Sequence, residues 1–326
     1  MPDRRGEPDR TWLHRIRKIL LGSIVFVIVF ALTGRIYEVV AQHRALASCP
    51  MTGVRVDVGG FRLFLNCTGA GSPSVILESG ATDSSRQWKK VQPEVAHTTR
   101  VCSYDRLGFG WSDPSSMPRS ARQMATELHT GLVDAGVRPP YVLVGHSFGG
   151  LVTQIFARLY PEEIAGIVLV DSVHPDEIAK FPDRFPASPT LARLLRLTAP
   201  LGLPRFFGWC NATAACPDCV KYTSAVLAEY DEYPESHTQA ATATTELGDK
   251  PLAVLAHDSE IGLGGQRDDA FESAWTAWQQ DLARRSNNSS LTIATGIGHE
   301  IQSDQPQLVI NTILRVVQAT RSHPLP

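Results

Sequence analysis

The sequence of 326 residues has no large excess of either charge, because 31 lysines and arginines nearly balance 33 aspartates and glutamates. The formal net charge of −2 argues against a nucleic-acid partner. The chain also lacks internal repeats and long low-complexity tracts. With 43% hydrophobic and 20% charged residues, its composition is that of an ordinary globular protein. We therefore expect one large domain with an insertion.

Cysteine is scarce, and its pattern does not predict a metal site. None of the six cysteines has a histidine at metal-ligand spacing, and the motif Cys216-Pro217-Asp218-Cys219 alone is a weak redox or zinc signal. Cys67 and Cys102 each lie in a predicted strand, so a cross-strand disulfide between them is plausible. The cysteines at 210, 216 and 219 could form a local bridge, with one left for Cys49. The sequence leaves this connectivity open.

A long apolar run occurs once, from Ile19 to Thr33. Its length of about 15 residues is slightly short of the roughly 20 that span a bilayer, although Lys18 and Arg35 could snorkel and extend it. The basic residues ahead of the run predict a cytoplasmic N-terminus, with the rest of the chain outside. These basic residues are Arg4, Arg5, Arg10, Arg15, Arg17 and Lys18.

A cleaved signal peptide is the alternative interpretation of this segment. Ala45-Leu46-Ala47 resembles a cleavage site, and residues 46–49 resemble a lipoprotein box. Both lie well beyond the apolar run, whereas processing normally occurs just after such a run. An uncleaved single-pass anchor is therefore favoured, and either interpretation exports the rest of the chain.

Alternation and short apolar runs predict strands that are separated by helices in most of the remaining chain. The predicted strands are 54–58 and 61–65, which form a hairpin, and then 74–78, 100–104, 141–144, 164–170, 251–256 and 291–294. The predicted helices lie around Trp88, at 119–136, at 268–285 and at 307–318. A further helix follows the glycine-rich turn after strand 141–144 and ends at Leu159. This order predicts an α/β fold with a mostly parallel sheet that helices cover on both faces.

The pattern changes between about Pro175 and Leu247, where prolines recur and strand runs disappear. Short helical stretches take their place, so we interpret this part as a helical lid. The expected organisation is a basic tail, anchor and linker at 1–50, a core at 51–174 and 249–326, and the lid at 175–248. Phe206, Phe207, Trp209 and Tyr222 in the lid suggest an apolar substrate or, more simply, the lid's own core.

Residues 141–151 combine a buried strand, the sequence Gly145-His146-Ser147-Phe148-Gly149 and the start of an amphipathic helix. In this context the pattern G-x-S-x-G predicts a nucleophile elbow, a tight turn that holds the serine in a strained backbone conformation. The two glycines leave room for strand and helix to approach. Ser147 is therefore the predicted nucleophile, above a helix N-terminus that favours negative charge.

The order of these parts resembles the α/β-hydrolase fold, in the branch of small lipases, esterases and peroxidase-like hydrolases. The resemblance covers about residues 53–320, and the lid is its divergent part. It rests on four motifs in the family's order, which are Ser79-Gly80-Ala81, Asp105-Arg106-x-Gly108-x-Gly110-x-Ser112, Gly145-His146-Ser147-Phe148-Gly149-Gly150 and Gly298-His299. The resemblance implies that Asp105, Arg106 and Ser112 hold the loop beside the elbow.

The resemblance also implies a base and an acid for the serine. His299 follows a late strand and precedes the final helix, which is where the family places its base. The acid has three candidates: Asp171 at the end of strand 164–170, and Glu260 or Asp258 after strand 251–256. We favour Asp171, because His257 stands where the family usually has a glycine in the later loop.

An oxyanion hole needs two backbone donors aimed at the developing negative charge. We expect these to be the amides of Phe148 and Ala81. Gly80, His146 and His174 are the further candidates for the substrate site. Gly80 would let the backbone turn inward, whereas the ring of His146 is expected to point away from the nucleophile and to be structural. His174, like His257, lies near a strand end and could line the pocket or serve only the structure.

Together these features predict a membrane-anchored, extracytoplasmic serine hydrolase that cleaves small or apolar carboxylic esters through an acyl-enzyme. The chemistry requires no metal and no cofactor, and the expected partners are the ester substrate and the membrane. A protein that binds a small ligand on the same fold without catalysis is one alternative. An acyltransferase is another. The sequence does not predict the oligomeric state.

Overall fold

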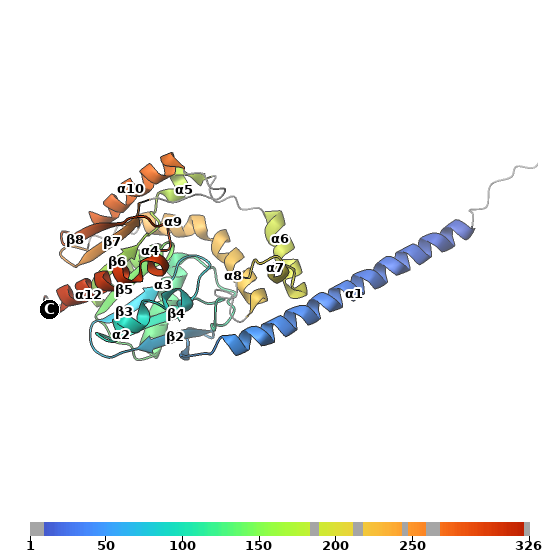
Figure 1. Cartoon of the computed structure of the whole chain (residues 1–326), viewed down its shortest axis with the longest axis horizontal. Coiled ribbons are helices and arrows are strands. Elements are labelled where there is room, and N and C mark those ends of the chain that lie inside the picture. The colour runs from blue at the N-terminus through green and yellow to red at the C-terminus, as the bar shows by residue number, and fades with distance from the viewer. Residues whose placement is uncertain (1–9, 183–188, 211–217, 243–246, 259–267, 323–326) are drawn as a thin grey trace, which may run out of the picture.

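A computed structural model of the chain describes residues 10–182, 189–210, 218–242, 247–258 and 268–322 (Figure 1). One sheet of eight strands forms its centre, in the order β1-β2-β4-β3-β5-β6-β7-β8. The strands are β1 (Val54–Asp57), β2 (Arg62–Thr68), β3 (Ser74–Glu78), β4 (Val101–Asp105), β5 (Tyr141–His146), β6 (Ile164–Val170), β7 (Leu252–His257) and β8 (Ser289–Ala294). The expected fold class is confirmed, since β3 to β8 are parallel and only β1 and β2 run antiparallel to their neighbours.

Successive side chains of the central strands enter two different cores. In β5, Val142 and Val144 join one apolar cluster, whereas Tyr141 and Leu143 join the other. This alternation follows from the period of two along a strand, and it requires apolar side chains at every position when both faces are covered. The unbroken run YVLV is therefore the expected sequence of a central strand.

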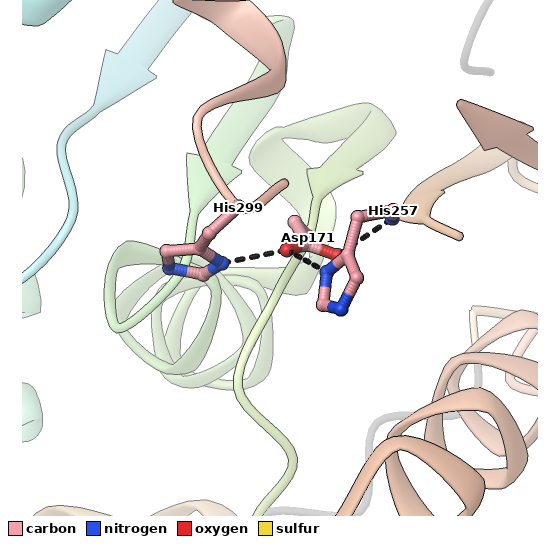
Figure 2. A group of neighbouring side chains, drawn as sticks. All are labelled: Asp171, His257 and His299. Carbon is pink, nitrogen blue, oxygen red and sulfur yellow. Dashed lines mark hydrogen bonds and ion pairs between the residues drawn. The ribbon is translucent and has the colours of Figure 1, made fainter. Parts of the chain in front are cut away.

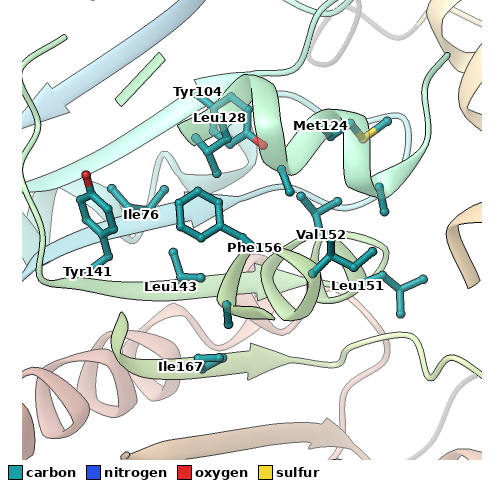
Figure 3. Packing of buried hydrophobic residues seen from close by; sticks show 14 of the residues in the cluster. Ile76, Tyr104, Met124, Leu128, Tyr141, Leu143, Leu151, Val152, Phe156 and Ile167 are labelled. Carbon is teal, nitrogen blue, oxygen red and sulfur yellow. The ribbon is translucent and has the colours of Figure 1, made fainter. Parts of the chain in front are cut away.

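Helices cover both faces of the sheet. On one face lie α3 (Ala121–Asp134) and α4 (Gly149–Leu159), whose packing against β3, β5 and β6 is seen in Figure 3. The other face is covered by the 3-10 helix η1 (Ser85–Trp88), α2 (Gln92–Ala96) and α12 (Pro306–Ser322). The long helix α10 (Asp269–Ala283) packs on β7 and β8, and the short helix α11 (Ile301–Asp304) precedes α12.

Helices also make up the described part of residues 175–248. They are α5 (Glu177–Lys180), α6 (Pro189–Thr198), the 3-10 helix η4 (Ala199–Leu201), α7 (Leu203–Phe206), α8 (Cys219–Asp231) and α9 (Tyr233–Thr242). The last two reach the carboxyl end of the sheet, because Glu229 of α8 contacts Thr82 after β3 and Tyr233 of α9 stacks on Phe148 after β5. Helix α9 also contacts α3 and α4. We keep the name lid for residues 175–248.

The predicted apolar run lies within one continuous helix, α1 (Arg10–Ser48). This helix is long and apolar enough to cross a membrane, and its most apolar window is not buried against the rest of the chain. It is longer than the run itself, because residues 34–48 continue as helix where we expected a linker. Figure 1 shows it projecting from the globular part, with α7 beside its carboxyl-terminal half.

The expected cross-strand disulfide between Cys67 and Cys102 is present, at paired positions of β2 and β4. Cys210 pairs with Cys219, which gives the local bridge in the lid. Cys49 is also disulfide-bonded. Within the described residues no cysteine is free.

Candidate active site

Ser147 lies in the tight turn between β5 and α4, as the pattern G-x-S-x-G predicts. Its φ is 51°, in the left-handed region that costs a residue with a Cβ about 1–3 kcal/mol. The turn is held in place from β6, because the amide of Ser147 donates to the carbonyl of Val170 at 3.1 Å. A Cβ at Gly145 would lie 2.7 Å from the carbonyl oxygen of Gly149, so the turn needs glycine at that position.

Asp171 and His299 are brought together at the carboxyl ends of β6 and β8 (Figure 2). Nδ1 of His299 donates to Oδ2 of Asp171 at 2.6 Å. Asp171 is fully buried, whereas the His299 side chain is 28% exposed. With its Nδ1 proton bound to the carboxylate, His299 carries its basic lone pair on Nε2. The backbone of Asp171 also has a positive φ, of 46°.

A second histidine holds the other side of the same carboxylate. His257 ends β7, and its Nδ1 also donates to Oδ2 of Asp171 at 2.6 Å (Figure 2). Its backbone amide donates to Oδ1 at 3.0 Å, as does Nε1 of Trp275 from α10. On the far side of the ring, Nε2 of His257 lies 3.2 Å from Oε2 of Glu272. Sequence reasoning placed His257 near the pocket but did not find Trp275 or Glu272.

These donors keep Asp171 ionised. Burial alone would raise the pKa of its carboxyl, but the hydrogen bonds from His257 and His299 outweigh burial and hold the pKa well below 3.8. The ionised Asp171 can therefore stabilise a positive charge on His299.

The loop after β3 lies against the elbow. A Cβ at Gly80 would lie 3.3 Å from the Cβ of Ser147 and 2.7 Å from Nδ1 of His146, so this position also needs glycine. The amide of Gly80 donates to Oε1 of Gln87. Among the hydrogen bonds of the described chain, the amides of Ala81 and Phe148 take no part, which suits the two predicted oxyanion donors.

A buried cluster of ion pairs around Arg106 holds the loop after β3 in place. Arg106 donates to the carbonyls of Ser79 and Gly80, at 2.7 Å each. Its guanidinium also pairs with Glu78 of β3 at 2.6 Å and with Glu229 of α8 at 2.7 Å. Oε2 of Glu229 in turn accepts the amide of Thr82 at 3.0 Å. Arg106 thus has the structural role that the motif implied, and the lid reaches the same loop.

The two alternative acids have different positions. Both carboxylate oxygens of Asp258 accept the backbone amide of Gly296 at 2.9 Å, on an exposed loop. Glu260 lies outside the described residues. Within the described part of the chain, the carboxylate bonded to His299 is that of Asp171.

His146 and His174 have protein neighbours at both ring nitrogens. The ring of His146 is buried between the carbonyl of His299 and Nε2 of Gln87, both at 3.1 Å. Burial lowers its pKa to about 3, so it is neutral. His174 bonds to Asp281 and stacks on Trp278. These contacts suit the structural role expected of His146 and the structural alternative for His174.

Asp171, His257 and His299 offer ligand atoms that lie within 4.8 Å of one another, so this group could hold a metal ion. The same atoms, however, bond to one another through two histidine protons. A metal would have to displace both protons. The chemistry of the donors therefore fits a hydrogen-bonded acid and base better than a metal centre.

A cavity of about 530 Å³ lies between the end of α1, β2 and η1. Its lining includes Pro50, Phe64, Arg86 and Trp111, but none of Ser147, Asp171 and His299. It is therefore separate from the candidate active site.

Comparison with known proteins identifies the family of this chain. A model of the alpha/beta hydrolase family matches residues 75–312. An uncharacterized protein of Bacillus subtilis, YqjL, is 26% identical over 74% of this chain and 82% of its own length. The solved structure of the epoxide hydrolase CorEH has a TM-score of 0.60 at 21% identity, covering 82% of this chain and 99% of that chain. An esterase from Thermogutta terrifontis has a TM-score of 0.57 at 21% identity, covering 82% and 98%. At these identities the solved structures share the fold alone, but the family match covers most of the chain. The chain belongs to the alpha/beta hydrolase family.

Proposed function

We propose that this protein is a membrane-anchored serine hydrolase that cleaves carboxylic esters through an acyl-enzyme, with Ser147, His299 and Asp171 as its catalytic residues. The observation that carries the proposal is the 2.6 Å hydrogen bond from His299 to the buried, ionised Asp171. It joins a base to an acid at the same sheet edge as the strained elbow of Ser147. A hydroxyl nucleophile needs such an oriented base at neutral pH.

The proposed reaction has two halves. Oγ of Ser147 attacks the ester carbonyl while Nε2 of His299 takes the hydroxyl proton, and the amides of Phe148 and Ala81 bind the oxyanion. Asp171 holds the tautomer of His299 and stabilises the imidazolium. His299 then returns the proton to the departing alcohol. In the second half, His299 activates a water molecule that releases the acid product and restores Ser147.

Esters are the proposed substrate class because this arrangement serves a tetrahedral acyl intermediate. One solved neighbour is named an epoxide hydrolase and another an esterase. A serine at the elbow favours the ester reaction, since epoxide hydrolysis on this fold uses an aspartate nucleophile. Helix α1 supports an anchored enzyme, and the basic residues before it support a catalytic domain outside the cytoplasm.

The test is ester turnover by the full chain in detergent micelles, with 4-nitrophenyl esters of graded acyl length. Ser147→Ala should reduce turnover to the background rate. Asp171→Asn should reduce kcat by about 10⁴-fold, because it removes the acceptor that fixes the tautomer of His299. The matched control is Asp258→Asn, which makes the same chemical change at the alternative acid and should leave kcat close to that of the parent.

A fluorophosphonate probe separates this proposal from its alternatives. The parent should form a covalent adduct at Ser147, and Ser147→Ala should not. A parent that is folded by circular dichroism but neither turns over esters nor reacts with the probe would refute the proposal and favour a ligand-binding protein. Ester consumption that depends on an added alcohol would indicate acyl transfer instead.

A further inference from the structure

The lid carries exposed apolar side chains on two neighbouring helices. Leu194 and Leu197 lie three residues apart on α6, and their exposed fractions are 55% and 75%. Phe206 and Phe207, at the end of α7, are 72% and 76% exposed, and Trp209 follows at 40%. We call these five residues the lid patch. The helices α6 and α7 are in contact, and exposed apolar patches of this kind usually mark an interaction surface.

The lid patch is attached to α1. Arg205 of α7 makes two hydrogen bonds of 2.9 Å to the carboxylate of Glu38, whose side chain is fully buried. Four residues earlier, a Cβ at Gly34 would lie 2.5 Å from the carbonyl oxygen of Leu201, so α1 and the lid are in close backbone contact. A Cβ at Gly202 would likewise meet the ring of Tyr37. These contacts place α7 beside α1 directly after the apolar run ends at Thr33 (Figure 1).

The length of the apolar run gives the level of the membrane at this point. Fifteen residues of helix cover about 22 Å, whereas the hydrocarbon core of a bilayer is about 30 Å thick. The missing length of about 8 Å corresponds to roughly five more residues. On the lid side these begin at Gly34 and include Ile36, which is 64% exposed, and Glu38. Glu38 is the one acidic residue of α1, and Arg205 neutralises it. The other charge in this stretch, Arg35, is exposed and can snorkel to the lipid headgroups, so the apolar layer can extend along α1 to the level of the lid.

We propose that the lid patch lies in the outer leaflet of the bilayer that α1 crosses, and that the enzyme acts on esters dissolved in that leaflet. This inference rests on the proposed function, because it requires both the anchor and ester hydrolysis. The ion pair between Arg205 and Glu38 holds the patch at the depth of the leaflet. The occupant of the patch is thus the lipid around α1, which is present wherever α1 is inserted.

The first test places the full chain in phosphatidylcholine vesicles whose acyl chains carry bromine, a quencher of tryptophan fluorescence. Trp12 lies in α1, so the reference is Trp12→Phe, and the test variant is Trp12→Phe with Trp209→Phe. Bromine should quench part of the fluorescence of the reference, and that part should be lost in the double variant. Equal quenching of the two proteins would overturn the proposal.

The second test compares two substrates in the same vesicles, a long-chain ester dissolved in the bilayer and a short water-soluble ester. Phe206→Asp with Phe207→Asp should lower turnover of the bilayer ester about tenfold, because aspartates disfavour a bilayer position. Turnover of the soluble ester should stay unchanged. The matched control is Val133→Asp on α3, where the parent side chain is 61% exposed and which should change neither rate. An equal effect on both esters, or none on either, would contradict the proposal.

Failure of the proposed function would be recognised separately. Extraction of the parent by alkaline carbonate would refute the anchor, and with it the docking of the lid patch. If the parent stays in the membrane but hydrolyses neither ester, the proposed reaction is refuted, and with it the bilayer substrate. Integration and hydrolysis of the soluble ester, without quenching through Trp209, would refute the docking alone.

Discussion

Backbone strain in this protein is concentrated at the candidate active site. In the described chain, three residues other than glycine have a positive φ: Ser147 at 51°, Asp171 at 46° and Thr82 at 64°. They belong to the elbow, to the end of β6 and to the loop after β3. Each costs about 1–3 kcal/mol, which the surrounding packing must offset. Strain at three separate turns around one site is typical of a preorganised catalytic centre.

The contact between His257 and Asp171 predicts a positioning role for His257. His257→Gln removes one of the hydrogen bonds that hold Asp171, and a bond to a charged group contributes about 1.5–3 kcal/mol. We expect kcat to fall at least tenfold with little change in KM, because the substrate contacts remain. The measurement is steady-state ester hydrolysis. The matched control is His174→Gln, which alters a buried histidine without a bond to Asp171. Equal losses in both variants would mean a general effect of buried histidines.

The lowered pKa of Asp171 predicts a pH dependence of stability. A carboxyl group whose pKa is lower in the folded than in the unfolded state stabilises the folded protein at pH values above the unfolded-state pKa near 3.8. This stabilisation is lost as the pH falls through the folded-state pKa. The parent should therefore unfold at a higher temperature than Asp171→Asn at pH 6, and the gap should narrow below about pH 4. Thermal unfolding in detergent at graded pH checks this. A gap that widens toward low pH would contradict it.

Sequence reasoning found the residues that lie in local motifs and missed those that depend on long-range packing. Ser147 stands in a recognisable turn, and Asp171 and His299 each follow a strand of the sheet. Trp275 and Glu272 belong to α10, and their side chains meet Asp171 and His257 only because α10 packs on β7 and β8. One signal was available, since Glu272 and Trp275 are three residues apart and therefore share a helix face.

At the scale of elements, the lid contacts the loop after β3 through Glu229. Glu229→Ala would remove one of the two carboxylates that pair with the buried Arg106 and would leave the amide of Thr82 without its acceptor. Removing one member of a buried ion pair costs about 3–5 kcal/mol, so we expect a large fall in the midpoint of thermal unfolding and slower ester turnover. Calorimetry and kinetics on the same preparation would measure both.

The control for this prediction lies on the same helix. Asp231→Ala breaks an exposed ion pair with Arg196, and such pairs contribute about 0–1 kcal/mol. Its unfolding midpoint and its turnover should stay close to those of the parent. Equal losses of stability and turnover in Glu229→Ala and Asp231→Ala would contradict the prediction, because the buried contact with Arg106 would then contribute no more than the exposed ion pair.

The strands were predictable because apolar runs of four to seven residues are enough to identify buried parallel strands. β3 and β6 begin and end where the sequence predicts, and the other strands differ by one to three residues at an end. The length of α1 was less predictable. Residues 34–48 include charged and polar side chains that argue for a linker, but contact with η4 and α7 stabilises them as helix.

At the scale of the whole molecule, the disulfides and the charge distribution both support the proposed location of the catalytic domain outside the cytoplasm. The bridge between Cys67 and Cys102 closes a loop of 35 residues, which stabilises the fold by about 4 kcal/mol in the chain-entropy model. Such a bridge persists only in an oxidising environment. A catalytic domain in the cytoplasm would lose this contribution. The orientation of α1 in the membrane therefore affects the stability of the folded domain.

The proposed orientation of α1 rests on the basic residues on its two sides. Six arginines and lysines precede Ile19, whereas Arg35 and Arg44 follow Thr33 before the sheet begins, and this asymmetry predicts an N-terminus in the cytoplasm. A phosphatase that needs disulfides for activity should be active when it is fused to the carboxyl terminus of the full chain. Replacing the six basic residues with glutamine should lower that activity, because the bias that orients α1 is then reversed. The opposite result is an inactive phosphatase, together with activity of a reporter that works only in the cytoplasm when it is fused at the same position. That result would place the candidate active site in the cytoplasm.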